Sequence, residues 1–276
     1  MSLNFCVLAS GSSGNCSIIW TDKTIVLVDL GCSSKYLTEN LNILKISPQS
    51  LTAVLITHAH IDHLSPSGLN FIIKNNLPIF THEHILKDIS QKYSTKIENC
   101  VNIPFSKSFE FEDLVVESFD VHHKDRNVSK TLGFTFLHYL NKRQYKIGYV
   151  TDTGKVCDKI INSLINSNIL VIESNYNRMM LDVSFRPYDN KVWVLSDYGH
   201  LSNEAAANAV CTIKNLSTKE DSLKYVFLAH ISQHHNSQEL ALKTANEIFF
   251  ENNISNIKLF VAKRKQKSPT IKIGDN

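Results

Sequence analysis

The chain has 276 residues, enough to bury a substantial hydrophobic core, and 43% of them are hydrophobic, as in an ordinary globular protein. No stretch approaches the roughly 18 to 20 apolar residues of a membrane span, and the Ser/Gly run at residues 10–15 interrupts any signal-peptide core. The net charge of +3 is too small to indicate nucleic-acid binding by itself, and the six cysteines, which form no CxxC pair, are typical of reduced thiols in a cytoplasmic protein.

The first part of the chain alternates predicted strands and helices, which is typical of an α/β architecture. Apolar runs predict strands at residues 3–9, 16–20, 24–31, 53–57 and 78–81, and helical patterns occupy residues 34–44, 66–75 and 83–93. The turn at residues 10–15 fits either a plain hairpin turn or a loop whose glycine N–H groups bind an anion.

The second part is rich in β-strand patterns before helices return. We expect antiparallel strands at residues 109–111, 114–121, 133–137 and 145–150. Further strands are predicted at 169–172, 225–229 and 258–262, helices at 158–166, 203–215 and 237–252, and a polar basic tail after residue 262. Ser202 or Asn203 is expected to cap the helix at 203–215.

One loop carries most of the metal-ligand chemistry. His58, His60, Asp62 and His63 directly follow a buried strand, which places four potential ligands at its end. Burying several histidines around one point requires an electrostatic reason, and a metal ion supplies it. The pattern therefore predicts a metal-binding loop rather than a polar turn.

Ligand-type residues also follow other predicted strands. Asp29 ends the strand at 24–31, His122 and His123 follow the strand at 114–121, and Asp152 and His230 follow the strands at 145–150 and 225–229. Polar residues at the carboxyl ends of apolar strands converge on one edge of a sheet, so we expect a site for two metal ions. His82 and His84 are instead expected to face solvent.

The pattern His58-x-His60-x-Asp62-His63 resembles the HxHxDH motif of the metallo-β-lactamase superfamily, and the resemblance extends over nearly the whole chain. It implies an α/β fold built as an αββα four-layer sandwich, with a single domain over residues 1–276. It also implies two divalent ions, Zn or Mn, because imidazole and carboxylate ligands suit either metal. The ligands implied are His58, His60 and His123 for one ion, Asp62, His63 and His230 for the other, and Asp152 as the bridge between them.

The third histidine of the first ion could be His122 or His123. His123 is favoured because a similar branch of the superfamily has a histidine followed, after a short loop, by Gly and an aromatic residue, matched here by Gly133-Phe134. Asp29 is expected to orient one of the ligand histidines.

Two further resemblances point to nucleic-acid phosphodiesters. His200 and Glu204 are similar to the HxxxE segment of ribonuclease Z-type enzymes, in which the histidine donates a proton to the leaving oxygen and the glutamate orients it. The alternative is a histidine at a helix entry and an acid on the helix face. Segments 8–15, 173–176 and 199–204 together resemble the YycJ/WalJ-like branch of the superfamily, bacterial cytoplasmic proteins regarded as DNA exonucleases.

The sequence thus predicts a metal-dependent phosphodiesterase, a DNA exonuclease, with His200, Glu204 and Asp62 as its catalytic residues. Lys124, Arg126, Lys130 and the basic run 263–267 are candidates for contacts with phosphates, although solvated surface charges are the alternative reading of that run. A hydrolase of a small ester, thioester or cyclic phosphodiester is the alternative function. A regulatory protein with a structural metal is disfavoured, because structural zinc sites close with four protein ligands.

Overall fold

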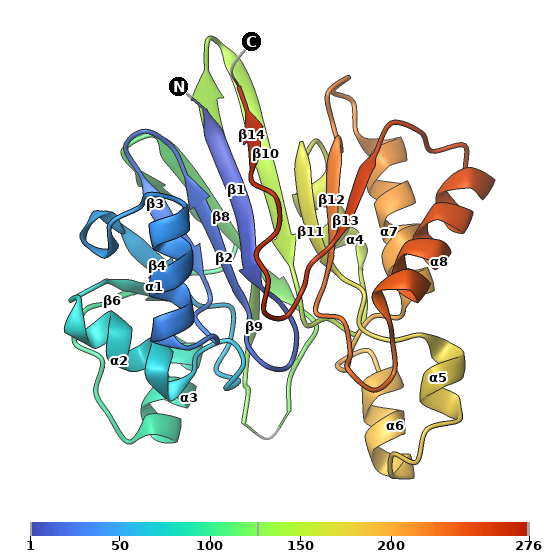
Figure 1. The fold of residues 1–276 in the computed structure, drawn as a ribbon, viewed down its shortest axis with the longest axis horizontal. Helices are drawn as coiled ribbons and strands as arrows, with labels where there is room; N and C mark the ends of the chain where they lie inside the picture. The colour runs from blue at the N-terminus through green and yellow to red at the C-terminus, as the bar shows by residue number, and fades with distance from the viewer. Residues whose placement is uncertain (1, 126, 275–276) are drawn as a thin grey trace.

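A computed structural model describes residues 2–125 and 127–274 of the chain. Two seven-stranded sheets face each other, and helices cover their outer faces (Figure 1). The layers therefore follow the order helix, sheet, sheet, helix, which confirms the predicted α/β sandwich. Among the described helices, none combines the length and the apolar character that crossing a membrane requires.

The first sheet has the strand order β14-β1-β2-β3-β4-β5-β6. Two of the helices that cover this sheet have a serine N-cap. Ser33 accepts a hydrogen bond from the Tyr36 N–H, and Ser65 accepts one from the Gly68 N–H. The elements of this half are β1 (Leu3–Ala9), β2 (Cys16–Trp20), β3 (Ile25–Val28), α1 (Ser34–Ile43), a 3₁₀ turn (Pro48–Ser50), β4 (Ala53–Leu55), α2 (Pro66–Lys74), β5 (Ile79–Thr81), α3 (Glu83–Tyr93), β6 (Cys100–Asn102) and, from the far end of the chain, β14 (Ile271–Ile273).

The second sheet has the order β13-β12-β11-β10-β9-β8-β7. Ser202 caps α7 by accepting a hydrogen bond from the Ala205 N–H, so of the two residues predicted for this role, Ser202 and Asn203, it is the former that fills it. The elements are β7 (Ser108–Phe111), β8 (Leu114–Val121), β9 (Thr131–Leu140), β10 (Arg143–Val150), α4 (Asp158–Leu164), β11 (Ile169–Glu173), α5 (Arg178–Asp182), α6 (Tyr188–Leu195), α7 (Asn203–Leu216), β12 (Tyr225–Ala229), α8 (Gln238–Glu251) and β13 (Lys258–Val261).

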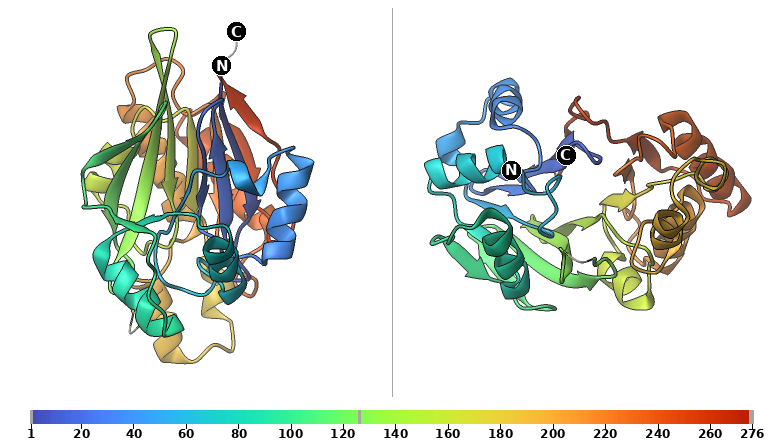
Figure 2. Two further views of the ribbon diagram at one scale, coloured as in Figure 1. Left: turned by 90° about the vertical axis from the view of Figure 1, so that its left-hand side faces the viewer. Right: turned by 90° about the horizontal axis from the view of Figure 1, so that it is seen from below.

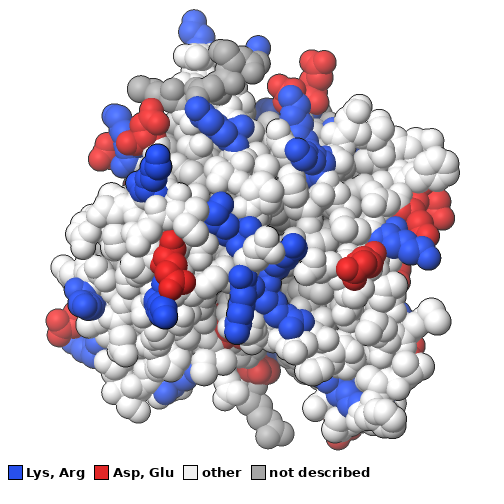
Figure 3. All heavy atoms as spheres, viewed as in Figure 1, with Lys and Arg blue, Asp and Glu red and all other residues white. Residues whose placement is uncertain are grey.

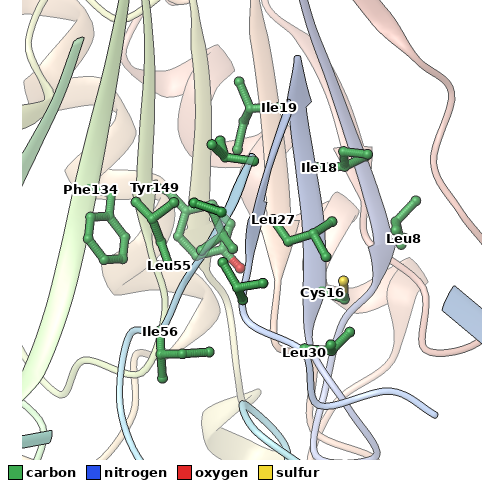
Figure 4. Close-up of a cluster of buried hydrophobic side chains, with 14 of the residues drawn as sticks. Leu8, Cys16, Ile18, Ile19, Leu27, Leu30, Leu55, Ile56, Phe134 and Tyr149 are labelled. Atoms are coloured by element: carbon green, nitrogen blue, oxygen red, sulfur yellow. The ribbon is translucent and has the colours of Figure 1, made fainter. Parts of the chain in front are cut away.

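The main core lies between the two sheets. Apolar side chains from both inner faces fill it, among them Leu27, Leu55 and Phe134 (Figure 4). Phe5 of β1 packs edge-to-face on Phe227 of β12 with ring centroids 5.2 Å apart, so the pair joins the two layers directly. Each such fully buried aromatic side chain contributes roughly 1.5–3 kcal/mol relative to an exposed one.

The tail after residue 262, which the sequence predicts to be polar and basic, contains the strand β14. β14 pairs antiparallel with β1, with Leu3 opposite Ile273 and Phe5 opposite Ile271. The sequence reading also lacked β6 and the two short helices α5 and α6, which extend from one end of the second sheet (Figures 1 and 2).

The strand directions determine where the polar strand ends meet. β3 and β4 are parallel, as are β10, β11 and β12. β8 also runs parallel to β10, because each pairs antiparallel with β9. The carboxyl ends of all these strands therefore lie at the end of the sandwich opposite the two chain termini (Figure 1).

Candidate metal centre

The loop after β4 folds back so that its histidines lie together. His58 and His63 are fully buried, and the His63 N–H donates to the carbonyl of His60 at 3.0 Å. His58 Nε2 lies 2.9 Å from His60 Nδ1, and His60 Nε2 lies 3.0 Å from the Asp125 carboxylate. Because a carboxylate only accepts, Nε2 of His60 carries the proton, which leaves its Nδ1 lone pair facing His58.

His123 completes the first group of ligands. Nitrogen atoms of His58, His60 and His123 all lie within 4.8 Å of one another. His123 Nδ1 donates to the carbonyl of Gly199 at 2.9 Å, so its Nε2 carries a lone pair, and that atom is buried without a hydrogen-bond partner. His122 lies outside the group, with its Nε2 3.9 Å from Cys157 Sγ.

Asp62, His63 and His230 form the second group, again with ligand atoms within 4.8 Å of one another. Asp62 Oδ2 lies 3.2 Å from His230 Nε2 and 3.7 Å from His63 Nε2. Asp152 lies between the two groups. Its Oδ2 atom is 3.0 Å from His63 Nε2 without hydrogen-bond geometry, and it is buried without a partner, while its Oδ1 is 3.4 Å from His230 Nδ1.

Asp29 holds His63 from behind. The His63 Nδ1–H donates to Asp29 Oδ2 at 2.7 Å, and the backbone N–H and hydroxyl of Thr57 donate to the same carboxylate. This arrangement fixes the imidazole so that Nε2 lies next to Asp152, which is the geometry expected if Asp29 orients a ligand histidine. Burial raises the pKa of Asp29, while the hydrogen bonds from His63 and Thr57 oppose that rise.

The turn between β1 and β2 supports the same loop. The Gly11 N–H donates to Asn15 Oδ1 and the Gly14 N–H donates to the Gly11 carbonyl, so both groups are used inside the turn and favour the plain hairpin reading. Asn15 Nδ2 reaches His63 Nε2 at 2.9 Å and the Asp62 carbonyl at 3.2 Å. The turn thus positions the metal loop.

Glu173, the last residue of β11, is a functional residue that sequence reasoning missed. Its Oε1 lies 2.7 Å from His200 Nδ1 and 2.9 Å from His230 Nδ1. Its Oε2 accepts from the backbone N–H groups of Thr153 and Leu201 at 2.9 and 3.1 Å. Its place at the carboxyl end of a buried strand was the available signal, since Asp29 and Asp152 occupy equivalent places.

Glu204, the residue expected to orient His200, does not contact it. Among the described residues, the carboxylates within 4.0 Å of His200 Nδ1 belong to Asp152 and Glu173. Glu204 lies in the first turn of α7, partly exposed. The structure therefore brings His200 to the centre but assigns the contact with its Nδ1 to Glu173. His82 and His84 lie apart at the start of α3, where His82 caps the helix.

Burial and neighbouring charges shift the pKa values of the buried histidines in opposite directions, upward for His63 and downward for His58 and His123. Burial lowers the pKa of His63, but the carboxylates of Asp152, Asp29 and Asp62 outweigh it and raise that pKa well above its usual value. Burial and the neighbouring His63 hold the pKa of His58 well below its usual value. Burial similarly lowers the pKa of His123 to about 4. His58 and His123 are therefore neutral, which is the form that binds metal.

Three residues at strand ends adopt left-handed backbone angles that non-glycine residues seldom show. The φ angles of Asp29, Asp152 and His230 are 61°, 54° and 54°. Such conformations cost on the order of 1–3 kcal/mol each and persist where the surroundings enforce them. Each turns a side chain from the end of its strand into the centre.

The arrangement fits two divalent metal ions. Asp152 Oδ2 and His123 Nε2 are buried without hydrogen bonds, a costly state that coordination of a cation relieves. Two groups of three ligands lie on either side of the Asp152 carboxylate: three imidazoles form the first, and two imidazoles with the Asp62 carboxylate form the second. The ligand chemistry suits zinc or manganese.

Comparison with known proteins places the chain in a family. The profile described as "Beta-lactamase superfamily domain" matches residues 24–231. Exodeoxyribonuclease YycJ of Bacillus anthracis is 32% identical over 260 residues, covering 91% of this chain and 90% of the relative. Exodeoxyribonuclease WalJ of Streptococcus pneumoniae is 32% identical over 243 residues, covering 87% and 86%.

A solved structure gives the same fold. The metallo-beta-lactamase fold protein YhfI of Bacillus subtilis superposes with a TM-score of 0.69 at 16% identity, covering 97% of this chain and 99% of that one. At this identity the likeness shows the fold alone, whereas the family profile and the relatives at 32% identity cover most of the sequence. The chain belongs to the metallo-β-lactamase superfamily, in its YycJ/WalJ-like branch.

Proposed function

We propose that the protein is a phosphodiesterase that uses two divalent metal ions, Zn or Mn, and acts on DNA as an exonuclease. The observation that carries the proposal is the pair of three-ligand groups around Asp152, with His200 beside them on the Glu173 carboxylate. The names of the relatives, both exodeoxyribonucleases, support DNA as the substrate.

His58, His60 and His123 would hold one ion, Asp62, His63 and His230 the other, and Asp152 both. When bound, two divalent ions would lower the pKa of a shared water to about 7 and offset negative charge on phosphoryl oxygens. Asp62 Oδ2 lies 3.2 Å from His230 Nε2, so the two atoms that would bind this ion are already close together.

His200 is the proposed general acid. Its Nδ1–H donates to Glu173 at 2.7 Å, which fixes the orientation of the ring and leaves Nε2 to pass a proton to the departing oxygen of the substrate. The side chain is 14% exposed, so it sits at the edge of the centre where a substrate can reach it. General acid catalysis of this kind typically contributes ~10²–10⁴ in rate.

A basic loop near the centre is suited to a phosphate backbone. The segment between β13 and β14 carries Lys263, Arg264, Lys265 and Lys267, and Figure 3 shows Lys and Arg side chains gathered over it. The Lys263 carbonyl accepts from the Ser10 N–H, and the Ser10 hydroxyl accepts from the His230 N–H, so the loop lies two contacts from a metal ligand. Cationic side chains there attract DNA by releasing counterions.

The other basic residues predicted to contact phosphates, those after β8, are less available to DNA. Lys130 pairs with Asp120 at 3.6 Å and lies over the Phe105 ring, which occupies its ammonium group. Lys124 remains exposed beside the centre, and Arg126 lies outside the described residues.

The test is metal analysis joined to a nuclease assay on single-stranded and duplex DNA labelled at the 5′ or 3′ end. We expect two ions per chain, stepwise shortening from one end, and loss of turnover with retention of metal in His200→Ala. Metal-loaded protein that is inert on DNA but cleaves a thioester or a small cyclic phosphodiester would replace this function with the small-substrate alternative. Affinity for DNA should also fall steeply with salt.

A further inference from the structure

An open cleft adjoins the metal centre on the side of α6. It has a volume of about 800 Å³, and two aromatic side chains, Trp193 and Tyr198, contribute to its wall. The remaining lining residues are cationic, acidic, amide or hydroxyl-bearing: Lys124, Asp125, Asn127, Asn190 and Ser196. The cleft therefore combines two aromatic side chains with polar and charged ones.

Trp193 connects this cleft with the centre. Its ring meets His123 edge-to-face at 5.7 Å and meets His200 at 5.4 Å with an interplanar angle of 88°. Asp125 provides a second connection, because it lines the cleft and holds His60 at 3.0 Å. A group bound in the cleft thus lies next to the reacting phosphate, on the side of His200.

The charges of the cleft suit a nucleotide. The Lys124 ammonium lies over the Tyr198 ring, 4.7 Å from its centroid, which places a cation beside an aromatic face. The Asp125 carboxylate accepts hydrogen bonds from the Asn127 N–H at 2.7 Å and from His60 Nε2 at 3.0 Å. The carboxylate is thus already engaged by His60 and the backbone.

We propose that this cleft is a nucleobase-binding subsite, which rests on the proposed phosphodiesterase function. Trp193 stacks on the base, and Lys124, which lies over the Tyr198 ring, faces the adjacent phosphate. Since Trp193 touches His200, the residue proposed to protonate the departing oxygen, the base belongs to the nucleotide that carries this oxygen. Aromatic stacking accepts any base, so the subsite selects nucleotides without selecting sequence.

The test compares short single-stranded DNA substrates that carry an abasic residue on one side or the other of the bond that is cut. The product with the free hydroxyl identifies the leaving side. For the metal-loaded wild type, kcat/KM should fall about tenfold or more when the leaving-side base is absent, and less when the other base is absent.

In Trp193→Ala this preference should collapse, so that the ratio of kcat/KM with and without the leaving-side base approaches one. The ratio cancels any effect of the substitution on His123 or His200, which both substrates share. Trp193→Phe should restore most of the preference, and Tyr198→Ala should reduce it. The matched control is Phe250→Ala, which removes an aromatic side chain that is 84% exposed on α8 and should keep the wild-type ratio.

Two results separate the failure of this inference from the failure of the function. Protein that degrades DNA but shows the same ratio in the wild type, Trp193→Ala and Trp193→Phe overturns the subsite and leaves the phosphodiesterase intact. Metal-loaded protein that is inert on every DNA substrate overturns both. If Trp193→Ala does not fold, the phenylalanine variant and Tyr198→Ala decide the same question.

Discussion

Glu173 links two histidines of the centre through a single carboxylate oxygen, at 2.7 Å from His200 and 2.9 Å from His230. A carboxylate accepts strong, charge-assisted hydrogen bonds from both rings, whereas a neutral amide forms weaker ones. We therefore expect Glu173→Gln to lower kcat by about 10²-fold or more, the range for losing a general acid. Steady-state kinetics with metal analysis of the same preparation measure this effect.

Glu204→Ala is the matched comparison, because it removes a partly exposed carboxylate from α7. It should leave kcat close to that of the wild type. The opposite ranking, with Glu204→Ala inactive and Glu173→Gln active, would return the orienting role to Glu204.

Asp29 is buried and fixes the ring of His63 by a 2.7 Å contact. Loss of such a carboxylate behind a ligand histidine typically weakens metal binding by about 10–100-fold. Asp29→Asn should therefore bind Zn²⁺ more weakly by a factor in this range, as measured by competition with a chromogenic chelator. Glu112→Gln, at a carboxylate whose side chain is 68% exposed, should bind like the wild type, and equal affinities in all three proteins would contradict the assignment.

At the residue scale, the sequence could group the candidate ligands, because His58, His60, Asp62 and His63 lie in one short segment and each remaining candidate follows an apolar strand. That these residues bind metal stays a prediction. The sequence did not identify the carboxylate that contacts His200. Glu204 is close in sequence, but Glu173 reaches His200 only because the turn before α7 lies beside the end of β11, where the Tyr176–Ser202 bridge joins them. That contact depends on tertiary packing.

At the scale of elements, β10 carries a partly buried cation, Lys146. Lys146 donates from Nζ to the carbonyl of Ile165, and burial lowers its pKa from 10.5 to about 8. Between these two values the unfolded chain binds more protons than the folded one, so this group makes stability rise with pH. Below pH 8 both states are protonated and the contribution is constant.

Lys146→Met should abolish this rise. Urea unfolding at about pH 7.5 and about pH 9.5 measures it, and the wild type should gain more stability between the two values than the variant does. Groups other than Lys146 titrate equally in both proteins and cancel in the comparison. The same pH dependence in both would show that Lys146 is solvated in the folded state.

The elements also show where sequence patterns lose information. Long apolar or capped segments, such as β1 and α7, were predicted nearly to their ends. β6 and β14 have three residues each, too few for an alternating pattern to stand out, and α5 has five. β14 exists because β1 offers it an edge, a partner more than 260 residues away that no local pattern contains.

For the whole molecule, the two proposed ions join the two sheets. His58 and His60 follow β4 of the first sheet, while His123 follows β8 of the second, and His63 and His230 are divided in the same way. Removal of metal should therefore lower the thermal stability of the entire sandwich. A ligand at 100 times its Kd stabilises a fold by about 2.7 kcal/mol per site.

Differential scanning calorimetry of chelator-treated protein measures this effect. We expect Tm to rise with added Zn²⁺ or Mn²⁺, and to rise less in His58→Ala, which lacks one ligand. An unchanged Tm across saturating metal would argue against binding at this place.

The number and identity of the ions, the single domain over residues 1–276 and a cytoplasmic location stay predictions.

The pairing of β14 with β1 places the first and last strands side by side, and both chain ends lie at the end of the sandwich opposite the candidate metal centre (Figure 1). Because the ends are neighbours, the chain could be joined there and opened elsewhere without changing how the strands pack. A circular permutant that joins the present ends by a short linker and opens the β9–β10 turn at Asn141 and Lys142 should keep both sheets. It should also keep the full set of ligands, because no bond that is cut or made lies near them.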